Sequence, residues 1–562
     1  MADNSFTFID WFDLVAYLGV FLGIAPLLGK YMANVLEGGK TFLHPLLHRL
    51  ESFTFRIARI DPNEEMSPMS YVGALLVFNA MAFILVFAIL FFQGALPFNP
   101  QHFPGLSWDK ALNSSVSLVT GTHWQPYPPE THFSYLSHLA GPTLVSFFSG
   151  ATGIAILAAL TRGISRNKES TLGNFWVDFV RSIVYIFLPL AILLALGLII
   201  QGVLQSFGPY VTATTLEGQT QIIPQGPAAT EVAIAQLSGG GGGFFNVSRA
   251  HPLENPSALS NFLERLGMLI IPGALPFTFG HLVKSKAQGF WIFGVMFVLW
   301  MTGSILAIVS DEHVRGMIGA EALMEGKETR IGIANSALWV TITTATGNGS
   351  MNSTLSSATP ITQTVAFFNL LAGNVIFGPP GLGLCNLFYF IGIAVFLSGL
   401  LVGRTPEFLG KQLDWKLMRW ISIGLFAPYL LILIGTSLAT IGLGQGHPPQ
   451  NFSEIAYSVS SIIRLNGSKL GAFNWDTPFY NVWTSFGMLT GWLFAIIPIL
   501  AIAGGLASKR IYPAETIEFA ILNRRFAALL ASIIVTLVFL VFFPLMLLGP
   551  LAEDILLFFG GS

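Results

Sequence analysis

Charged residues are scarce in this sequence. Asp, Glu, Lys and Arg make up 10% of the 562 residues, whereas soluble domains carry about 25%. Hydrophobic residues make up 53%, and the mean hydropathy is +0.67. We therefore expect a polytopic membrane protein embedded in a lipid bilayer. The formal net charge of −2 provides no basic field, which argues against nucleic-acid binding.

Cysteine and nucleotide-binding motifs are also nearly absent. The one cysteine, Cys385, excludes an internal disulfide framework and a multi-cysteine metal site. The segment Gly38-Gly39-Lys40-Thr41 resembles the end of a phosphate-binding loop, but Asn34 stands where the leading glycine belongs. An apolar helical segment precedes it, and no aspartate has a phosphorylation context. The sequence thus predicts neither a nucleotide site nor ATP hydrolysis on this chain.

Apolar runs of about 20 residues predict membrane-spanning helices. Ten are expected, near residues 11–33, 71–95, 134–160, 177–203, 260–282, 289–310, 362–401, 420–444, 482–506 and 526–549. The 362–401 run is too long for one straight span, and its Gly378-Pro379-Pro380-Gly381 segment must break or kink the helix. Residues 1–10 lack the basic segment of a removable signal peptide, so insertion relies on the first span.

The basic residues predict the orientation of these spans. Nineteen of the 27 Lys and Arg fall in alternate connections, and seven fall in the opposite ones. The first set is expected in the cytoplasm, which places both termini on the outer side.

Four outward connections share one pattern: a short helix-like stretch followed by a turn with exposed backbone. The short helices are expected at 111–119, 228–237, 335–345 and 455–463. The turns contain Thr120, Gly121, Thr122, His123 and Gln125; Gly239, Gly240, Gly241, Gly242 and Gly243; Gly347, Asn348 and Gly349; and Asn466, Gly467 and Ser468. Irregular backbone at membrane depth persists only where protein buries it or where it lines a water-filled cavity. Four such turns around one axis bring backbone carbonyls together as a cation filter.

The pattern divides the chain into six segments. We expect a first helix and connection at 1–60, pore repeats at 61–165, 166–285, 286–412 and 413–510, and a last helix at 511–562. The third repeat contains the broken segment. The predicted fold is an all-α membrane protein of about ten spans, with four span–loop–span repeats around a pseudo-fourfold axis.

Two other functions fit parts of the pattern. His123, His132 and His138 share one outer connection with Glu130 and suggest an integral-membrane enzyme, but their spacing matches no common metal-ligand motif. A free-standing cation channel or symporter fits the four-loop pattern equally well. The pore argument alone does not separate it from a pump subunit.

Several segments resemble the KdpA family, the potassium-binding subunits of bacterial Kdp-type potassium-transporting ATPases. The resemblance runs nearly end to end and rests on Pro26–Ala33, Ser170–Asp178, Gly241–Asn246, His251–Pro256, Met324–Glu328 and Gly403–Lys411. It implies a Trk/Ktr-like fold, a potassium ion as the bound species, and a location in the bacterial inner membrane. It also implies a separate P-type ATPase subunit for ATP hydrolysis and small single-span subunits as partners.

All four turns depart from the family pattern. Gly121 and His123 replace usual asparagines, and Gly239-Gly240 stands where Thr-Asn is common. Asn348 replaces a cysteine, and Arg464-Leu465 precedes Asn466. Mostly backbone contacts are implied, so cation binding is expected to survive, while the affinity for potassium is open.

Five residues are candidates for gating or coupling. Gly378 and Gly381 flank the break, which we expect to obstruct the inner vestibule, and Arg404 belongs to the cytoplasmic family segment. Arg464 either faces the ion path, where it repels cations, or points behind the turn and pairs with Glu454 or Asp476. Trp492 stands where the family commonly has an arginine.

Overall fold

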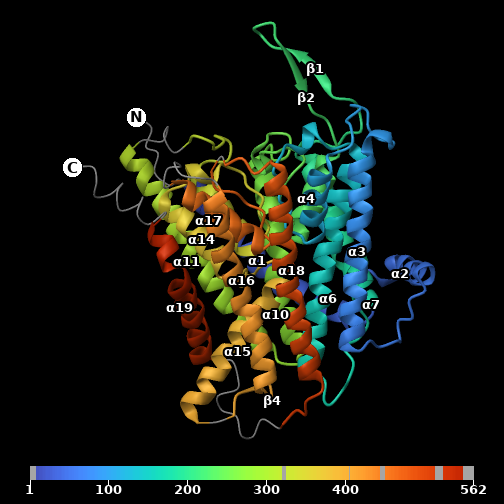
Figure 1. The fold of residues 1–562 in the computed structure, drawn as a ribbon, viewed down its shortest axis with the longest axis vertical. Coiled ribbons are helices and arrows are strands. Elements are labelled where there is room, and N and C mark those ends of the chain that lie inside the picture. The colour runs from blue at the N-terminus through green and yellow to red at the C-terminus, as the bar shows by residue number, and fades with distance from the viewer. Residues whose placement is uncertain are drawn as a thin grey trace.

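The computed structural model describes residues 8–318, 324–403, 405–442, 450–471, 473–512 and 523–548. The described chain is mostly helical and contains ten helices long and apolar enough to span a membrane. Figure 1 shows them bundled along one direction. The predicted all-α polytopic fold is confirmed.

The ten spans lie where the hydropathy predicts them. They are built from α1 (Phe8–Leu36), α3 (Pro68–Phe92), α5 (Tyr135–His138) with α6 (Ser146–Ser165), α7 (Phe175–Arg181) with α8 (Leu188–Ile200), α10 (Ala258–Leu282), α11 (Lys286–Ile318), α15 (Leu382–Val402), α16 (Trp415–Gly442), α18 (Pro478–Ala507) and α19 (Arg524–Leu548). Short π-helical segments, Leu139–Val145 and Ser182–Phe187, join the two composite spans. Pro142 lies inside the first of these segments, where a proline is tolerated at such a bulge.

The long apolar run after residue 360 is divided, as its sequence predicts. α14 (Pro360–Leu371) ends before the break, and only α15 after it is long enough to span a membrane. Ser-Pro and Thr-Pro pairs begin several helices. Ser67, Thr359 and Thr477 each accept a hydrogen bond from a backbone N–H of the first turn, and proline follows at the first helical position.

Four short helices precede the four predicted turns. They are α4 (Trp108–Val119), α9 (Ala228–Ser238), α13 (Ile333–Thr346) and α17 (Gln450–Ile463), and they confirm the predicted positions. The spans on either side of each short helix pack against it: α3 and α6 flank α4, for example, while α16 and α18 flank α17.

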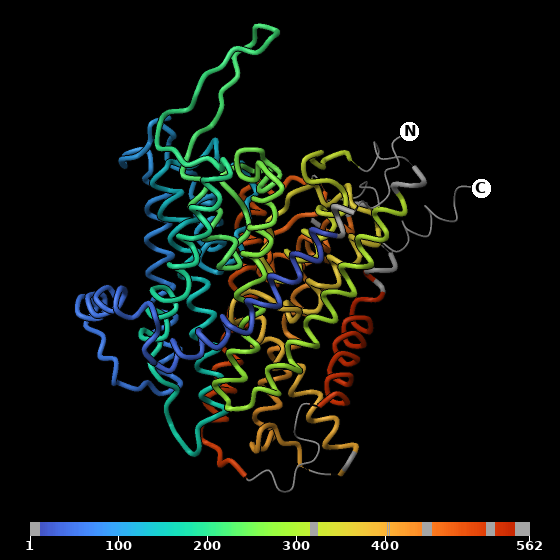
Figure 2. Tube along the Cα trace, turned by 180° about the vertical axis from the view of Figure 1, so that it is seen from behind, coloured from blue at the N-terminus to red at the C-terminus, as the bar shows by residue number. Residues whose placement is uncertain are grey.

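The four repeats close into a ring. α9 contacts α6 of the first repeat, α13 contacts α10 of the second, and α17 contacts α14 of the third. α18 of the fourth repeat packs against α3, α4 and α6, which closes the ring. α1 lies obliquely across this bundle and packs against α10 (Figure 2).

The remaining elements lie outside the ring. α2 (His44–Ala58) projects from the side of the bundle, and the hairpin of β1 (Val211–Thr214) and β2 (Thr220–Ile223) projects from one end (Figure 1). The short pair of β3 (Glu407–Phe408) and β4 (Lys411–Gln412) lies at the opposite end. α1 begins and α19 ends at the end that carries the β1–β2 hairpin (Figure 1).

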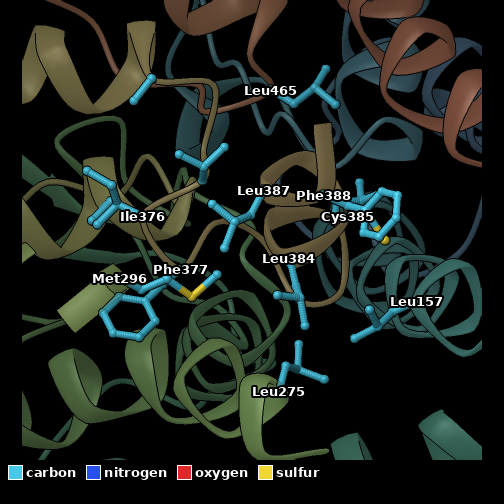
Figure 3. Packing of buried hydrophobic residues seen from close by; sticks show 14 of the residues in the cluster. Leu157, Leu275, Met296, Ile376, Phe377, Leu384, Cys385, Leu387, Phe388 and Leu465 are labelled. Carbon is cyan, nitrogen blue, oxygen red and sulfur yellow. The ribbon is translucent and has the colours of Figure 1, made fainter. Parts of the chain in front are cut away.

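The largest apolar cluster lies between the spans, around α15. Leu384, Cys385 and Leu387 from α15 pack together with Leu157 of α6 and Leu275 of α10 (Figure 3). The Cys385 thiol is fully buried in this cluster and free. Tight apolar packing here fixes α15 and the break before it relative to the short helices.

Candidate functional site

The four turns have the same backbone geometry. Thr122, Gly240, Asn348 and Asn466 each donate a backbone N–H to the carbonyl five residues earlier, at 2.9, 2.9, 3.0 and 2.9 Å. This bond is typical of a helix C-terminus that ends in a left-handed residue. The shared bond aligns turn 1 (120–125), turn 2 (238–243), turn 3 (346–351) and turn 4 (464–469) position by position.

The residue before each of these donors is left-handed. Gly121, Gly239 and Gly347 have φ of 75°, 75° and 66°, which glycine adopts without steric cost. Leu465 occupies the same position in turn 4 with φ of 58°. Turn 4 therefore keeps the backbone geometry although it lacks the glycine.

Close contacts join the four turns into a ring. A methyl group added to Gly240 would overlap the His123 ring of turn 1, and one added to Gly241 would overlap the Asn348 carbonyl of turn 3. A methyl group on Gly349 would overlap the Asn466 carbonyl of turn 4. One on Gly467 would overlap the Thr122 carbonyl of turn 1. Each turn thus abuts the next, and glycine is required where the backbones approach.

Two asparagines at equivalent positions bridge to the preceding repeat. The Asn348 Nδ2 donates to the carbonyls of Ala235 and Gly240, both at 3.3 Å. The Asn466 Nδ2 donates to the Thr343 carbonyl at 3.1 Å. Their Oδ1 atoms each accept the backbone N–H two residues later, at 3.1 Å. Both side chains are fully buried, so these bonds fix turns 3 and 4 in place.

Gln125 and Lys469, at equivalent positions, close the outer rim. The Gln125 Nε2 donates to the Gly243 carbonyl at 3.0 Å, and the Gly243 N–H donates back to Oε1 at 3.2 Å. The Lys469 Nζ donates to the Gln125 carbonyl and lies 5.0 Å from the centre of the Trp124 ring. Lys469 was not among the predicted site residues, and the only signal for it was its place one residue after Ser468.

A cavity of about 490 Å³ opens above the ring of turns, among the outer connections. All four turns contribute to its lining, through His123, Gln125, Gly242, Gly349, Gly467 and Ser468. We call this cavity the vestibule. It gives a solvated approach to the point where the four turns meet.

The three histidines of the first outer connection do not converge. His123 Nε2 lies 3.2 Å from Ser146 Oγ, His132 contacts the Pro128 carbonyl, and His138 pairs with Glu231 at 2.9 Å. Burial, with a smaller contribution from the charge of Arg249, lowers the pKa of His123 to about 3. The imidazole at turn 1 is therefore neutral at physiological pH and adds no charge to the ring.

Turn 2 is supported from behind by a buried charged cluster. The Arg249 guanidinium lies 2.8 Å from Glu254 and 3.3 Å from Glu264, and all three side chains are fully buried. The Glu254 carboxylate also accepts the Phe244 N–H at 2.9 Å. Burial raises the pKa of Glu254 to about 8, while the Arg249 charge opposes this rise. The cluster stands directly behind Gly243, where a side chain would meet it.

Comparison with known proteins identifies the family. A family model described as the potassium-transporting ATPase A subunit, KdpA, matches residues 15–555. The chain belongs to the KdpA family. Curated potassium-binding subunits of potassium-transporting ATPases from Pseudomonas fluorescens and Pseudomonas aeruginosa are 42% and 43% identical to it over 556 residues, which cover 97% of this chain and 99% of each relative. The subunit from Rhodospirillum centenum is 43% identical over 561 residues, 98% of both chains.

One solved structure has a similar fold. The crystal structure of the potassium transporter TrkH from Vibrio parahaemolyticus matches with a TM-score of 0.51, over 85% of this chain and 97% of that one. The two sequences are 15% identical, so the likeness concerns the fold alone. It agrees with the four pore-loop repeats, and the expected Trk-like fold is confirmed.

The break around Gly378 to Gly381 lies directly against turns 2 and 3. Gly378 and Gly381 are left-handed, with φ of 66° and 82°. A methyl group on Gly347 would lie 2.7 Å from Pro379, and one on Gly239 would lie 2.8 Å from Pro380. The Gly378 N–H donates to the Ala345 carbonyl of α13 at 2.8 Å. The break therefore supports turns 2 and 3 on the side away from the vestibule.

Arg464 points behind turn 4. Its guanidinium lies 4.6 Å from the centre of the Tyr429 ring of α16, and it lines a small cavity with Asn374 and Pro379. Of the two acids considered as partners for an Arg464 behind the turn, Asp476 pairs with Lys110 at 2.7 Å. Glu454 instead lies against Gly471.

The other two coupling candidates have different outcomes. Trp492 is buried within α18, so no charge stands at this position where KdpA relatives were expected to carry an arginine. Arg404 lies outside the described residues.

Proposed function

We propose that this chain is the potassium-binding, ion-selecting subunit of an ATP-driven potassium uptake complex. The observation that carries the proposal is the closed ring of four equivalent turns beneath one vestibule. Relatives covering the whole chain are named potassium-binding subunits of potassium-transporting ATPases. A potassium ion is the substrate, and it enters from the vestibule.

The ring selects the ion through its backbone. Potassium leaves its water shell when enough carbonyl oxygens replace it, and the four turns supply carbonyls from one ring of glycine-rich backbone. The short helices direct their C-terminal ends, which carry partial negative charge, at the same place. The filter residues are those of the sequence analysis, Thr120–Gln125, Gly239–Gly243, Gly347–Gly349 and Asn466–Ser468, organised by the repeats 61–165, 166–285, 286–412 and 413–510.

The surroundings of the chain follow from its family. The partners are a P-type ATPase subunit that hydrolyses ATP and small single-span subunits. The chain lies in the bacterial inner membrane with the vestibule and both termini on the outer side, as the distribution of Lys and Arg indicates. ATP hydrolysis on another subunit agrees with the sequence, in which no phosphorylation motif was recognised.

The break around Gly378 to Gly381 forms an inner gate, because it lets the segment that follows obstruct the inner vestibule. Its two prolines touch turns 2 and 3, and the apolar cluster around α15 fills the space beyond it. Deleting several residues just after Gly381 should raise passive cation leak in vesicles. Unchanged leak in correctly inserted protein would reject the gate.

Transport is tested with the complete complex in vesicles. ATPase activity and ion uptake are measured against potassium, sodium and ammonium, and potassium should stimulate both. A complex that no alkali cation stimulates contradicts the proposal. Vesicles holding this chain alone should conduct no potassium, because rapid ATP-independent flux would instead identify a free-standing channel.

A further inference from the structure

Lys469 is the one lysine that reaches the turns among the residues that the structure describes. Its Nζ donates to the Gln125 carbonyl at the outer end of turn 1, and the side chain lines the vestibule together with Gly242, Gly349 and Gly467. The ammonium thus sits where turns 1 and 4 meet at the mouth of the proposed filter. Its target is a backbone carbonyl, the same kind of group that coordinates a dehydrated potassium ion.

The lysine ammonium is chemically close to the ion that the site takes. It is a compact single positive charge with three N–H donors and no acceptor, and it is strongly hydrated in water. No carboxylate among the described residues forms an ion pair with it. The charge of Asp476 acts on it, but the Asp476 carboxylate is held by Lys110 at 2.7 Å. The Lys469 Nζ lies 5.0 Å from the centre of the Trp124 ring, and a cation–π interaction with the face of this ring stabilises the ammonium. The site therefore holds the ammonium of the protein's own lysine at the filter mouth.

We propose that Lys469 is a tethered competitor of potassium: its ammonium occupies the outermost cation position of the filter and must leave the Gln125 carbonyl before an ion enters. This inference rests on the proposed function and adds a regulatory residue to it. Competition from the Lys469 ammonium lowers the affinity for external potassium below the affinity that the four turns would have without this lysine. It also identifies a site for small primary ammonium ions at the same mouth.

The test compares potassium-stimulated ATPase activity of the complete complex for the unmodified chain and Lys469→Met. We expect the half-saturating potassium concentration to fall about fivefold in the variant, because a repelling unit charge is removed from the mouth. A rise in the half-saturating concentration, or no change, overturns the inference and makes Lys469 a clamp between turns 1 and 4.

Two further experiments separate competition by Lys469 from a general effect of positive charge in the vestibule. Lys327→Met removes a second ammonium from the vestibule, one that donates to the Ser357 carbonyl and lies 3.8 Å from Asp311, and it should shift the concentration less than twofold. Methylammonium should inhibit Lys469→Ala competitively and leave the unmodified chain unaffected; equal inhibition of both contradicts the proposal. If potassium fails to stimulate the unmodified complex, the proposed function itself fails.

Discussion

Turn 4 has the same backbone geometry as the other three turns but different residues at its first two positions. Turns 1, 2 and 3 begin with Thr120, Ser238 and Thr346, each followed by a left-handed glycine. Turn 4 begins with Arg464 and a left-handed leucine, yet its N–H to carbonyl bond is the same length within 0.1 Å. The backbone hydrogen bond and the contacts with neighbouring turns therefore set the geometry, and residue identity at the first two positions does not.

The electrostatics, in contrast, do depend on those residues. An uncharged hydroxyl residue stands at the end of α9 and α13 and directly after α4, so the partial negative charge of these helices acts on the ring undiminished. At the end of α17 the Arg464 guanidinium offsets that charge from behind the turn, where it lies over Tyr429. All four turns share the backbone geometry, but only three of them present a helix end whose partial negative charge is not offset by an arginine. A cation at the axis is accordingly attracted more strongly by turns 1–3 than by turn 4.

The largest effect is expected where the backbones touch. Gly349→Ala places a methyl group against the Asn466 carbonyl at φ of 85°, and no side chain can move aside because the obstacle is backbone. Turn 4 must shift, and a displacement of about 1 Å in a binding geometry can cost about 100-fold in rate. Potassium-stimulated ATPase activity at subsaturating potassium should fall by about that factor.

The control for this substitution is Gly218→Ala. Gly218 lies in the β1–β2 hairpin with φ of 79° and has open space around its added methyl group. It carries the same backbone strain without the overlap, so activity should be retained. Comparable loss in both variants would mean that left-handed strain, rather than contact between turns 3 and 4, explains the effect.

A second, smaller effect concerns the two buried asparagines. Asn348→Ala and Asn466→Ala each remove an amide that bridges two repeats, and each lost hydrogen bond contributes about 1 kcal/mol. Each variant should raise the half-saturating potassium concentration about tenfold and lower the melting temperature of the complex. Thr122→Ala, at the equivalent position in turn 1, removes only the 2.8 Å hydrogen bond to Thr120. It should therefore change the half-saturating potassium concentration less than either asparagine variant. Equal shifts in all three would argue against the bridging role.

Hydropathy and turn chemistry were sufficient to predict most of the fold. The ten spans follow from apolar runs, and the four short helices follow from Ala-, Ser- and Val-rich stretches that end in glycine or asparagine. The glycine positions of the turns were predictable for the same reason, because only glycine permits both left-handed backbone and close approach. The division of the 362–401 run followed from its Gly-Pro-Pro-Gly segment.

Contacts between distant segments were not predictable. The register of the turns depends on a hydrogen bond that leaves no residue signature, since Leu465 adopts the same conformation as three glycines. The direction of Arg464 depends on Tyr429, which is 35 residues away in a different span, and the pairing of Asp476 depends on Lys110 in the first repeat. Such long-range partners are set by packing of the spans, which composition and spacing do not encode.

The charge difference between turns is tested by Arg464→Thr, which gives turn 4 the residue of turns 1 and 3. Removing the guanidinium restores the partial negative charge at the end of α17, an effect of about 0.3–1 kcal/mol. The half-saturating potassium concentration should fall about two- to fivefold, a smaller change than the tenfold rise expected on removing an asparagine bridge. Because this charge lies in the protein interior, added salt should change the effect little. An unaltered concentration would show that the guanidinium is a structural support against Tyr429 and does not act on the ion.

The smallest effect is expected at Leu465, where backbone strain and side-chain burial oppose each other. A left-handed conformation costs a non-glycine residue about 1–2 kcal/mol, while the Leu465 side chain is 5% exposed and packs in the apolar cluster of Figure 3. Leu465→Ala loses the burial and keeps the strain, whereas Leu465→Gly loses the burial and relieves the strain. Leu465→Gly should therefore be the more stable of the two variants by about 1 kcal/mol in thermal unfolding of the complex, although both fall below the unmodified chain. If Leu465→Ala is instead the more stable variant, the left-handed conformation at position 465 does not strain the backbone of turn 4.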